Sequence, residues 1–243
     1  MLVILLPPSE GKAPGGNGPG WSVDDGRFGP ELAAGRTRVV NALKRAKGGT
    51  AKQLGARADL LTAAKAANLG VVGAPTLAAH ERFTGVVWGN LDPPSLTAAA
   101  RRRAEAGVLV LSALTGLTAW ADPVPDFRLK LSASVPPVGN VAAFWRPFLS
   151  PILNDHLAGH TVLDLLPNEH RAAWIPEPDR YDLIRPSLEH RNGKPAGHGG
   201  KAAKGLLARA LLISGDVDGT LATFDPAAQG LVGADELLLR RPA

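Results

Sequence analysis

Short hydrophobic runs separated by polar, helix-forming stretches predict a mixed α/β protein. The first run covers residues 1–6 and ends at two prolines, which is typical of a buried strand and too short for a membrane span. Similar runs over 108–111 and 161–166 predict two more buried strands. Weaker extended segments are predicted over 181–189, 220–224 and 236–240.

Helix propensity, caps and glycine stop signals predict helices between and after these runs. They cover residues 31–46, 51–68, 77–83, 96–106, 144–157 and 201–213. The glycine- and proline-rich stretch 13–30 predicts a flexible loop. No repeat or linker divides the chain, so we expect one compact α/β domain over residues 1–243, with a central mixed sheet and surrounding helices.

The composition excludes several classes of function. Apolar residues make up 45% and charged residues 20%, which is usual for a soluble globular protein. The absence of cysteine excludes disulfides, thiolate metal sites and cysteine nucleophiles. No stretch approaches the ~20 apolar residues that a membrane-spanning helix needs, and no signal peptide is found. We therefore expect a cytoplasmic protein with no membrane partner.

The net charge of +5 is unevenly distributed. Positions 31 to 65 contain eight basic residues and only two acidic ones. The basic residues are Arg36, Arg38, Lys44, Arg45, Lys47, Lys52, Arg57 and Lys65. Smaller basic clusters lie at 101–103 and at Lys201, Lys204 and Arg209. A local excess of Lys and Arg suits a polyanion-binding surface, because phosphate contacts release counterions. A solvated helix face is the alternative interpretation.

Polar side chains follow each of the buried strands. They are Ser9, Glu10 and Lys12 after the first strand, Asp122 and Arg128 after the second, and Asn168, Glu169 and His170 after the third. Loops at strand ends are where α/β proteins usually place binding or catalytic groups. Lys201 and Lys204 lie near the start of a helix that a glycine-rich turn opens, which favours phosphate. Surface turns with routine salt bridges are the alternative.

Several standard motifs are absent. Gly11-Lys12 is not a phosphate-binding P-loop, because Leu6 stands where the first glycine is required and Ala13 replaces the Ser or Thr. Ser9-x-x-Lys12 lacks the S-D-N and K-T-G elements of penicillin-recognising enzymes. The histidines show no metal-ligand spacing, so we predict no metal site and no cofactor. Iron binding by Glu169, His170, Glu189 and His190 is a weak further alternative.

Seven segments in this order resemble the YaaA family of peroxide stress proteins (DUF328/UPF0246). They are the first strand into Pro-Ser-Glu-Gly-Lys at 8–12, Phe-Thr-Gly-Val-Val-Trp-Gly-Asn-Leu at 83–91, Leu111-Ser112-x-Leu114-x-Gly116 with Asp122, Arg128 and Leu129, Phe144-Trp145, Asp-Leu-Leu-Pro-Asn-Glu at 164–169, Lys201-x-x-Lys204-Gly205 with Arg209, and Glu236-Leu237. The resemblance spans essentially the whole chain.

The resemblance implies a cytoplasmic protein of the peroxide-stress response that binds DNA through a basic cleft and limits free intracellular iron. It also implies a helix-hairpin-helix-like basic segment around 36–83. The residues expected to bind DNA or another anion are Ser9, Lys12, Arg128, Lys201, Lys204, Arg209, Lys44, Arg45 and Lys52, with Asp122 and Asn168 in support. The chain departs from the usual pattern at Glu10-Gly11-Lys12, at Phe127 and at Lys130.

An enzyme acting on a nucleotide or another anionic small molecule is the alternative function. It suits a polar pocket built from Ser9, Glu10, Lys12, Arg128, Glu169 and Lys201, because carboxylates repel a duplex but serve acid–base chemistry. Glu10 or Glu169 would be the general acid or base. A closed pocket shared by these residues favours a small ligand, whereas a long basic groove favours DNA.

Overall fold

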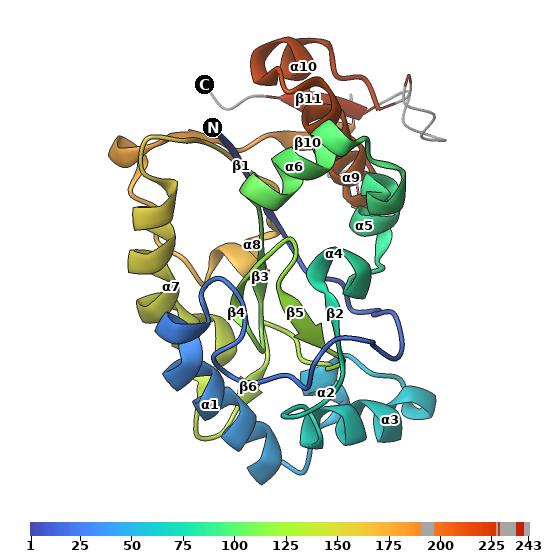
Figure 1. Cartoon of the computed structure of the whole chain (residues 1–243), viewed down its shortest axis with the longest axis vertical. Coiled ribbons are helices and arrows are strands. Elements are labelled where there is room, and N and C mark those ends of the chain that lie inside the picture. Colours follow the sequence, from blue (N-terminus) through green and yellow to red (C-terminus); the bar gives the residue numbers. More distant parts are fainter. Residues whose placement is uncertain (191–196, 227, 229–236, 241–243) are drawn as a thin grey trace.

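A five-stranded mixed sheet forms the centre of the molecule (Figure 1). The computed structural model describes residues 1–190, 197–226, 228 and 237–240. The sheet has the order β4-β3-β1-β8-β9, with β1 Leu2–Leu6, β3 Val108–Ser112, β4 Gly116–Ala119, β8 Thr161–Asp164 and β9 Asp182–Ile184. Only β4 is antiparallel to its neighbour. The predicted α/β class with a central mixed sheet is confirmed.

Strand β1 lies at the middle of this sheet and is buried on both faces. It pairs in parallel with β3 on one side and with β8 on the other, so that Leu5 lies opposite both Leu109 and Asp164. Val3 and Ile4 are at most 1% exposed. Burial on both faces explains why this strand is a continuous apolar run rather than an alternating one.

The connections that follow β1 and β8 lead toward opposite edges of the sheet. After β1 the next strand of the sheet is β3, on one side, whereas after β8 the next is β9, on the other. The carboxyl ends of β1 and β8 therefore form a topological switch point, the place where open α/β sheets leave a crevice for ligands.

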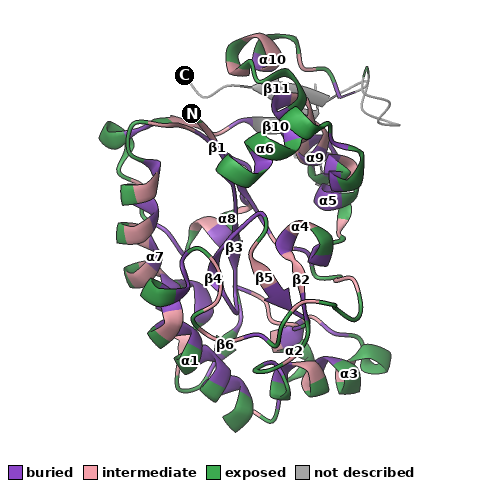
Figure 2. Cartoon of the chain, in the orientation of Figure 1, coloured by how far each residue is buried: buried purple, intermediate pink, exposed green. Residues whose placement is uncertain are grey.

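Helices cover the sheet on both sides (Figure 1). Those of the described residues are α1 Gly29–Arg45, α2 Ala51–Leu54, α3 Ala58–Leu69, α4 Ala79–Arg82, α5 Val86–Leu91, α6 Ala98–Gly107, α7 Val141–Leu157, α8 Asn168–Arg171, α9 Gly197–Ser214 and α10 Val217–Thr223, with 3-10 turns at Pro93–Ser95 and Pro178–Arg180. Buried residues gather on the central strands and on the inward faces of the helices (Figure 2). No helix of the described residues is long and apolar enough to cross a membrane.

The described residues also form three two-stranded ladders. They are β2 Thr76–Ala78 with β5 Pro123–Pro125, β6 Ser134–Val135 with β7 Gly139–Asn140, and β10 Ser187–His190 with β11 Leu237–Arg240. The last ladder agrees with the extended structure predicted over 181–189 and 236–240. Position 236 itself lies outside the described residues.

Three sequence predictions are wrong in detail. The helix predicted over 51–68 is broken into α2 and α3, because Gly55 adopts a left-handed conformation with φ of 61°. The helix predicted over 77–83 begins as strand β2, which pairs with β5 through contacts distant in sequence. The strand predicted over 220–224 is instead helix α10, whose N-cap Asp216 accepts a hydrogen bond from the backbone N–H of Gly219.

Buried arginines hold the loop predicted over 13–30. Arg36 donates hydrogen bonds to the backbone oxygens of Val23, Asp25, Thr115 and Leu117. Arg36 is 2% exposed, and burial lowers its pKa to about 10. Its inclusion in a polyanion-binding surface is therefore wrong, because its guanidinium is already satisfied inside the fold. Arg82 similarly binds the backbone oxygens of Ala13 and Gly15.

Candidate functional site

A pocket of about 460 Å³ lies at the switch point between β1 and β8. Its walls come from the loop after β1, from α5, from residues 128–131, from the loop between β8 and α8, and from α9. Six residues of the predicted polar pocket line it together: Ser9, Glu10, Lys12, Arg128, Glu169 and Lys201. Lys204, His170 and Lys130 also line it. The pocket thus unites segments that are up to 197 positions apart in the sequence, from Pro7 to Lys204.

The loop after β1 is fixed against the segment that opens α5. Ser9 Oγ accepts a hydrogen bond from the backbone N–H of Thr84 at 2.9 Å and donates one to the backbone oxygen of Gly11. A Cβ added at Gly85 would lie 2.8 Å from Ser9 Cβ, so a glycine is required for this approach. Trp88 Nε1 donates to the backbone oxygen of Pro7 at 3.0 Å. These contacts hold the loop in one conformation at the mouth of the pocket.

Lys12 lies half-buried between this loop and two aromatic rings. Its Nζ is 4.2 Å from the ring centroid of Phe127 and donates a hydrogen bond to the backbone oxygen of Ser9 at 3.1 Å. Burial lowers the pKa of Lys12 from 10.5 to about 7; nearby Arg128 and Arg82 lower it further, and the carboxylates of Asp126 and Glu10 oppose them. At neutral pH, a large share of Lys12 is therefore the uncharged amine.

Arg128 links the pocket to the turn between α2 and α3. Its side chain donates hydrogen bonds to the backbone oxygens of Leu54 and Gly55 at 3.2 and 3.3 Å. Asn68 fixes its backbone through hydrogen bonds of 2.9 and 2.8 Å. Arg128 Nη2 lies 3.7 Å from the carboxylate of Glu10, whose side chain is 66% exposed. The exposed carboxylate of Glu10 can therefore turn toward a ligand, whereas the backbone oxygens hold the guanidinium of Arg128 at the pocket wall.

Glu169 and His170 enter the pocket from the short helix α8. The side chain of Glu169 is 52% exposed, and its Oε1 lies 3.7 Å from His170 Nδ1. Burial lowers the pKa of His170 to about 4, so the imidazole is neutral at physiological pH. Its Nδ1 has no hydrogen-bond partner among the described residues. A buried polar atom without a hydrogen bond is rare in proteins, and His170 is one of the residues that line the pocket.

Helix α9 supplies two lysines one turn apart. Lys201 is exposed, whereas Lys204 Nζ donates to the backbone oxygen of Leu165 at 2.8 Å. Burial and the neighbouring Arg171 lower the pKa of Lys204 to about 8. A Cβ added at Gly205 would lie 2.2 Å from the backbone oxygen of Val87, so glycine lets α9 pack closely against α5. Both lysines of this Lys-x-x-Lys-Gly segment line the pocket.

The chain matches a family model described as "Peroxide stress protein YaaA" over residues 1–218. It is also 33% identical over 220 residues to a UPF0246 protein of Streptomyces coelicolor, covering 88% of this chain and 84% of that protein. The chain belongs to the YaaA family of peroxide stress proteins. A UPF0246 protein of Corynebacterium efficiens is 29% identical over 215 residues, covering 88% of this chain and 86% of the relative.

The remaining predicted residues of this YaaA-family chain lie outside the pocket lining. Asp122 accepts hydrogen bonds from the backbone N–H groups of Arg27 and Ala119, which fixes a turn. Arg209 donates to the backbone oxygens of Leu91 and Asp92 at the end of α5. Lys44, Arg45, Lys52 and Asn168 are exposed on α1, α2 and α8.

Sequence reasoning does not place His170 and Lys130 in this pocket. Each is close in sequence to a predicted pocket residue, since His170 directly follows Glu169 and Lys130 is two positions after Arg128. In an extended segment, side chains two positions apart lie on the same face. The sequence marks Lys130 only as a departure from the YaaA pattern, and the structure places it in the pocket lining.

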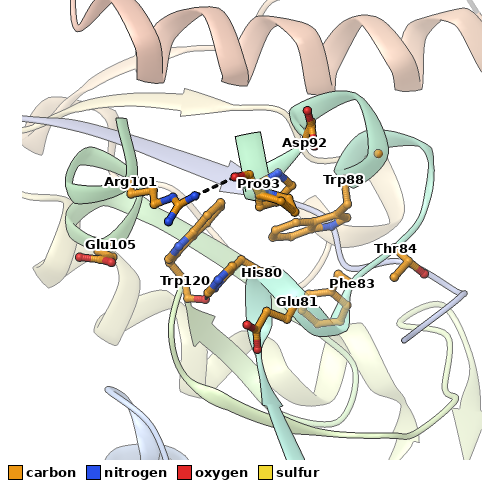
Figure 3. Close-up of a pocket in the computed structure, with 12 residues that line it drawn as sticks. His80, Glu81, Phe83, Thr84, Trp88, Asp92, Pro93, Arg101, Glu105 and Trp120 are labelled. Atoms are coloured by element: carbon orange, nitrogen blue, oxygen red, sulfur yellow. Dashed lines mark hydrogen bonds between the residues drawn. The ribbon is translucent and has the colours of Figure 1, made fainter. Parts of the chain in front are cut away.

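A second pocket, of about 590 Å³, shares Trp88 with the first (Figure 3). The rings of His80 and Trp120 stack in it with centroids 4.8 Å apart, and Arg101 donates to the backbone oxygen of Pro94 at 2.7 Å. Trp88 and Trp120 are only 1% and 2% exposed, so they offer a ligand little ring surface. None of the predicted site residues lines it.

Within the described part of the chain, no three His, Asp or Glu side chains group closely enough to hold a metal ion. Of the proposed iron ligands, Glu169 and His170 lie together, whereas the side chains of Glu189 and His190 lie outside the described residues. Iron binding by this set stays untested by the structure.

Proposed function

We propose that this YaaA-family protein binds a small anionic molecule, such as a nucleotide or another phosphorylated compound, in the switch-point pocket. The observation that carries the proposal is the convergence of Lys12, Arg128 and Lys201 in one pocket. Its volume of about 460 Å³ lies within the usual range for small-ligand sites. Crevices at the carboxyl ends of parallel strands are where α/β folds bind such ligands.

Enzyme chemistry on this ligand is part of the proposal. Glu10 and Glu169 are exposed carboxylates beside the cations, in positions suited to a general acid or base. Lys12 and Lys204 have pKa values lowered to about 7 and about 8. Ionisable groups shifted toward neutrality by burial are concentrated at catalytic sites, although structural networks shift them as well.

Lys201→Ala is expected to weaken binding of pyrophosphate and of ADP about tenfold, because it removes an exposed ammonium group from the pocket rim. Isothermal titration calorimetry measures this effect. Lys44→Ala is the matched control, since Lys44 is exposed on α1 and does not line the pocket. Equal affinities for the wild type and both variants would remove the support for the proposal.

DNA binding is the second candidate, and the exposed cations near the ends of α1 and α2 favour it. Lys44, Arg45, Lys47, Lys52 and Arg57 are all exposed there, at the end of the molecule where α1, α2 and α3 meet (Figure 1). They extend beyond the pocket, as a surface that follows a phosphate backbone requires. Limitation of free iron, which the resemblance implies, stays a prediction.

Duplex DNA affinity distinguishes this candidate from the first. The double variant Lys44→Ala/Lys52→Ala is expected to weaken DNA binding several-fold and to reduce its salt dependence, while Lys201→Ala has little effect. Fluorescence anisotropy with a labelled duplex at rising salt measures both quantities. Affinity that does not change between low and moderate salt would sink the DNA candidate.

A further inference from the structure

The surroundings of Lys12 differ from those of an ordinary anion-binding lysine. Its Nζ lies over the ring of Phe127 at 4.2 Å and near that of Phe83 at 5.8 Å. Its hydrogen bond goes to a backbone oxygen, that of Ser9, and no carboxylate of the described residues pairs with it within 4.0 Å. The ring faces attract a cation. Burial nevertheless removes water from the ammonium group, and no carboxylate of the described residues pairs with it directly, so the charged form loses part of its usual stabilisation.

Two guanidinium groups add to this effect. Arg128 lines the same pocket, and Arg82 lies behind the loop, held by backbone oxygens. Both act against a positive charge on Lys12, whereas Asp126 and Glu10 favour it. Burial beside other cations is the arrangement that turns a lysine amine into a nucleophile, because the free amine then exists at neutral pH.

We propose that Lys12 is a nucleophile that forms an imine with the carbonyl group of an anionic ligand. The substrate class is then an aldehyde or ketone that carries a phosphate or carboxylate group. The inference rests on the proposed function, since Arg128 and Lys201 hold the anionic group in the same pocket. It adds a covalent step that anion binding alone does not require.

The step balances without a further reactant. The lone pair of Lys12 Nζ attacks the carbonyl carbon, and the π pair of the carbonyl moves to its oxygen, which takes up a proton. The nitrogen loses a proton to give a carbinolamine, whose hydroxyl takes up a second proton and leaves as water. The nitrogen lone pair forms the C=N bond of a protonated imine, which then releases that second proton. One amine and one carbonyl thus give one imine and one water. Glu10 and Glu169 are the carboxyl groups of the pocket that can carry these protons.

Pyridoxal 5′-phosphate tests the inference, because it joins an aldehyde to a phosphate. The full chain is incubated with it at pH 7, the imine is reduced with borohydride, and the labelled peptide is identified by mass spectrometry. We expect Lys12 to carry the main adduct, since an ordinary lysine has only about 0.04% free amine at this pH. Pyridoxal, which lacks the phosphate, is expected to label Lys12 at least tenfold less.

Variants test whether Lys12 itself carries the adduct. Lys12→Arg replaces the amine with a guanidinium, which does not form the imine, and it is expected to abolish the main adduct, while Lys65→Arg, outside the pocket lining, leaves it unchanged. If Lys12→Arg does not fold, Lys12→Met replaces it in the same assay. Lys201→Ala is expected to slow labelling of Lys12 about tenfold at limiting probe, because the phosphate is held less well.

The possible outcomes separate the two proposals. Labelling of surface lysines only, while calorimetry still shows pyrophosphate binding, would overturn the imine and leave the proposed function standing. Absence of both labelling and anion binding would overturn both. Labelling of Lys12 that rises with pH around 7, and that pyrophosphate suppresses, supports both. Burial chiefly sets the pKa of Lys12 that governs this rise, and the charged groups that act on it are Asp126, Arg128, Arg82 and Glu10.

Discussion

Asp164→Asn is expected to lower the free energy of unfolding by about 3 kcal/mol. Asp164 is fully buried at the end of β8, and its Oδ2 accepts hydrogen bonds from Nε of Arg171 at 2.8 Å and of Arg185 at 2.9 Å. Its Oδ1 accepts from the backbone N–H of Leu166 at 2.9 Å. Asparagine keeps the shape but removes the charge that both guanidinium groups require.

The partners of Asp164 limit the size of this loss. The side chains of Arg171 and Arg185 are 29% and 36% exposed, so water can partly replace the lost carboxylate. Urea denaturation measures the change, and Asp155→Asn is the matched control. Asp155 pairs with Arg180 at 2.9 Å but is 74% exposed, so its loss is expected to cost below about 1 kcal/mol. Equal effects of the two substitutions would contradict this account of Asp164.

Lys12→Met is expected to raise the free energy of unfolding by about 2 kcal/mol at pH 6. The pKa of Lys12 falls from 10.5 to about 7 on folding, chiefly through burial. Because a tenfold change in proton affinity corresponds to about 1.36 kcal/mol, the whole fall in pKa sets an upper limit of ~5 kcal/mol on the gain. Partial exposure and the lost hydrogen bond to Ser9 reduce it.

The gain in stability from Lys12→Met is expected to shrink as the pH rises. Between pH 7 and pH 10.5 the unfolded chain binds the proton that folded Lys12 has released. The wild type therefore gains stability from Lys12 as pH rises through this window, and the advantage of methionine shrinks. Urea denaturation at pH 6 and pH 9 measures both values. Lys44→Met, at an exposed site, is expected to show no such trend, and a Lys12→Met variant less stable than wild type at pH 6 would contradict the argument.

The expected stabilisation by Lys12→Met indicates that Lys12 serves the function of the protein and not its stability. For the charged amine, the cost of burial beside Arg128 is expected to exceed what its hydrogen bond to Ser9 and its contact with the ring of Phe127 contribute. Groups that break the ordinary rules of burial are expected mainly at functional sites, where stability is given up for activity. The two stability predictions thus separate Asp164, which supports the fold, from Lys12, which the fold tolerates.

The sequence was sufficient for the main strands of the sheet and for six residues that share the pocket. Apolar runs of four to six residues specify buried strands directly, and polar residues that follow parallel strands must meet at one edge of the sheet. Strand order was not predictable, because it depends on pairings such as Leu5 with Asp164 that are distant in sequence. Short elements such as α5 and α8 were missed because four to six residues carry too little periodicity.

Clusters of basic residues predicted binding residues less reliably than apolar runs predicted strands. Arg36 and Lys44 look alike in the sequence, yet one is buried among backbone oxygens and the other is exposed. Arg209 similarly binds the end of α5 instead of lining the pocket. A run of basic residues does not reveal which guanidinium groups the fold itself uses, since that depends on carbonyl oxygens from remote loops.

The location of a bound anion tests the central claim most directly. A crystal structure of the protein soaked with pyrophosphate is expected to show the anion in the pocket between β1 and β8, within hydrogen-bond distance of Lys201 and Arg128. Pyrophosphate bound only along the exposed cations of α1 and α2, with the switch-point pocket holding none, would contradict the account.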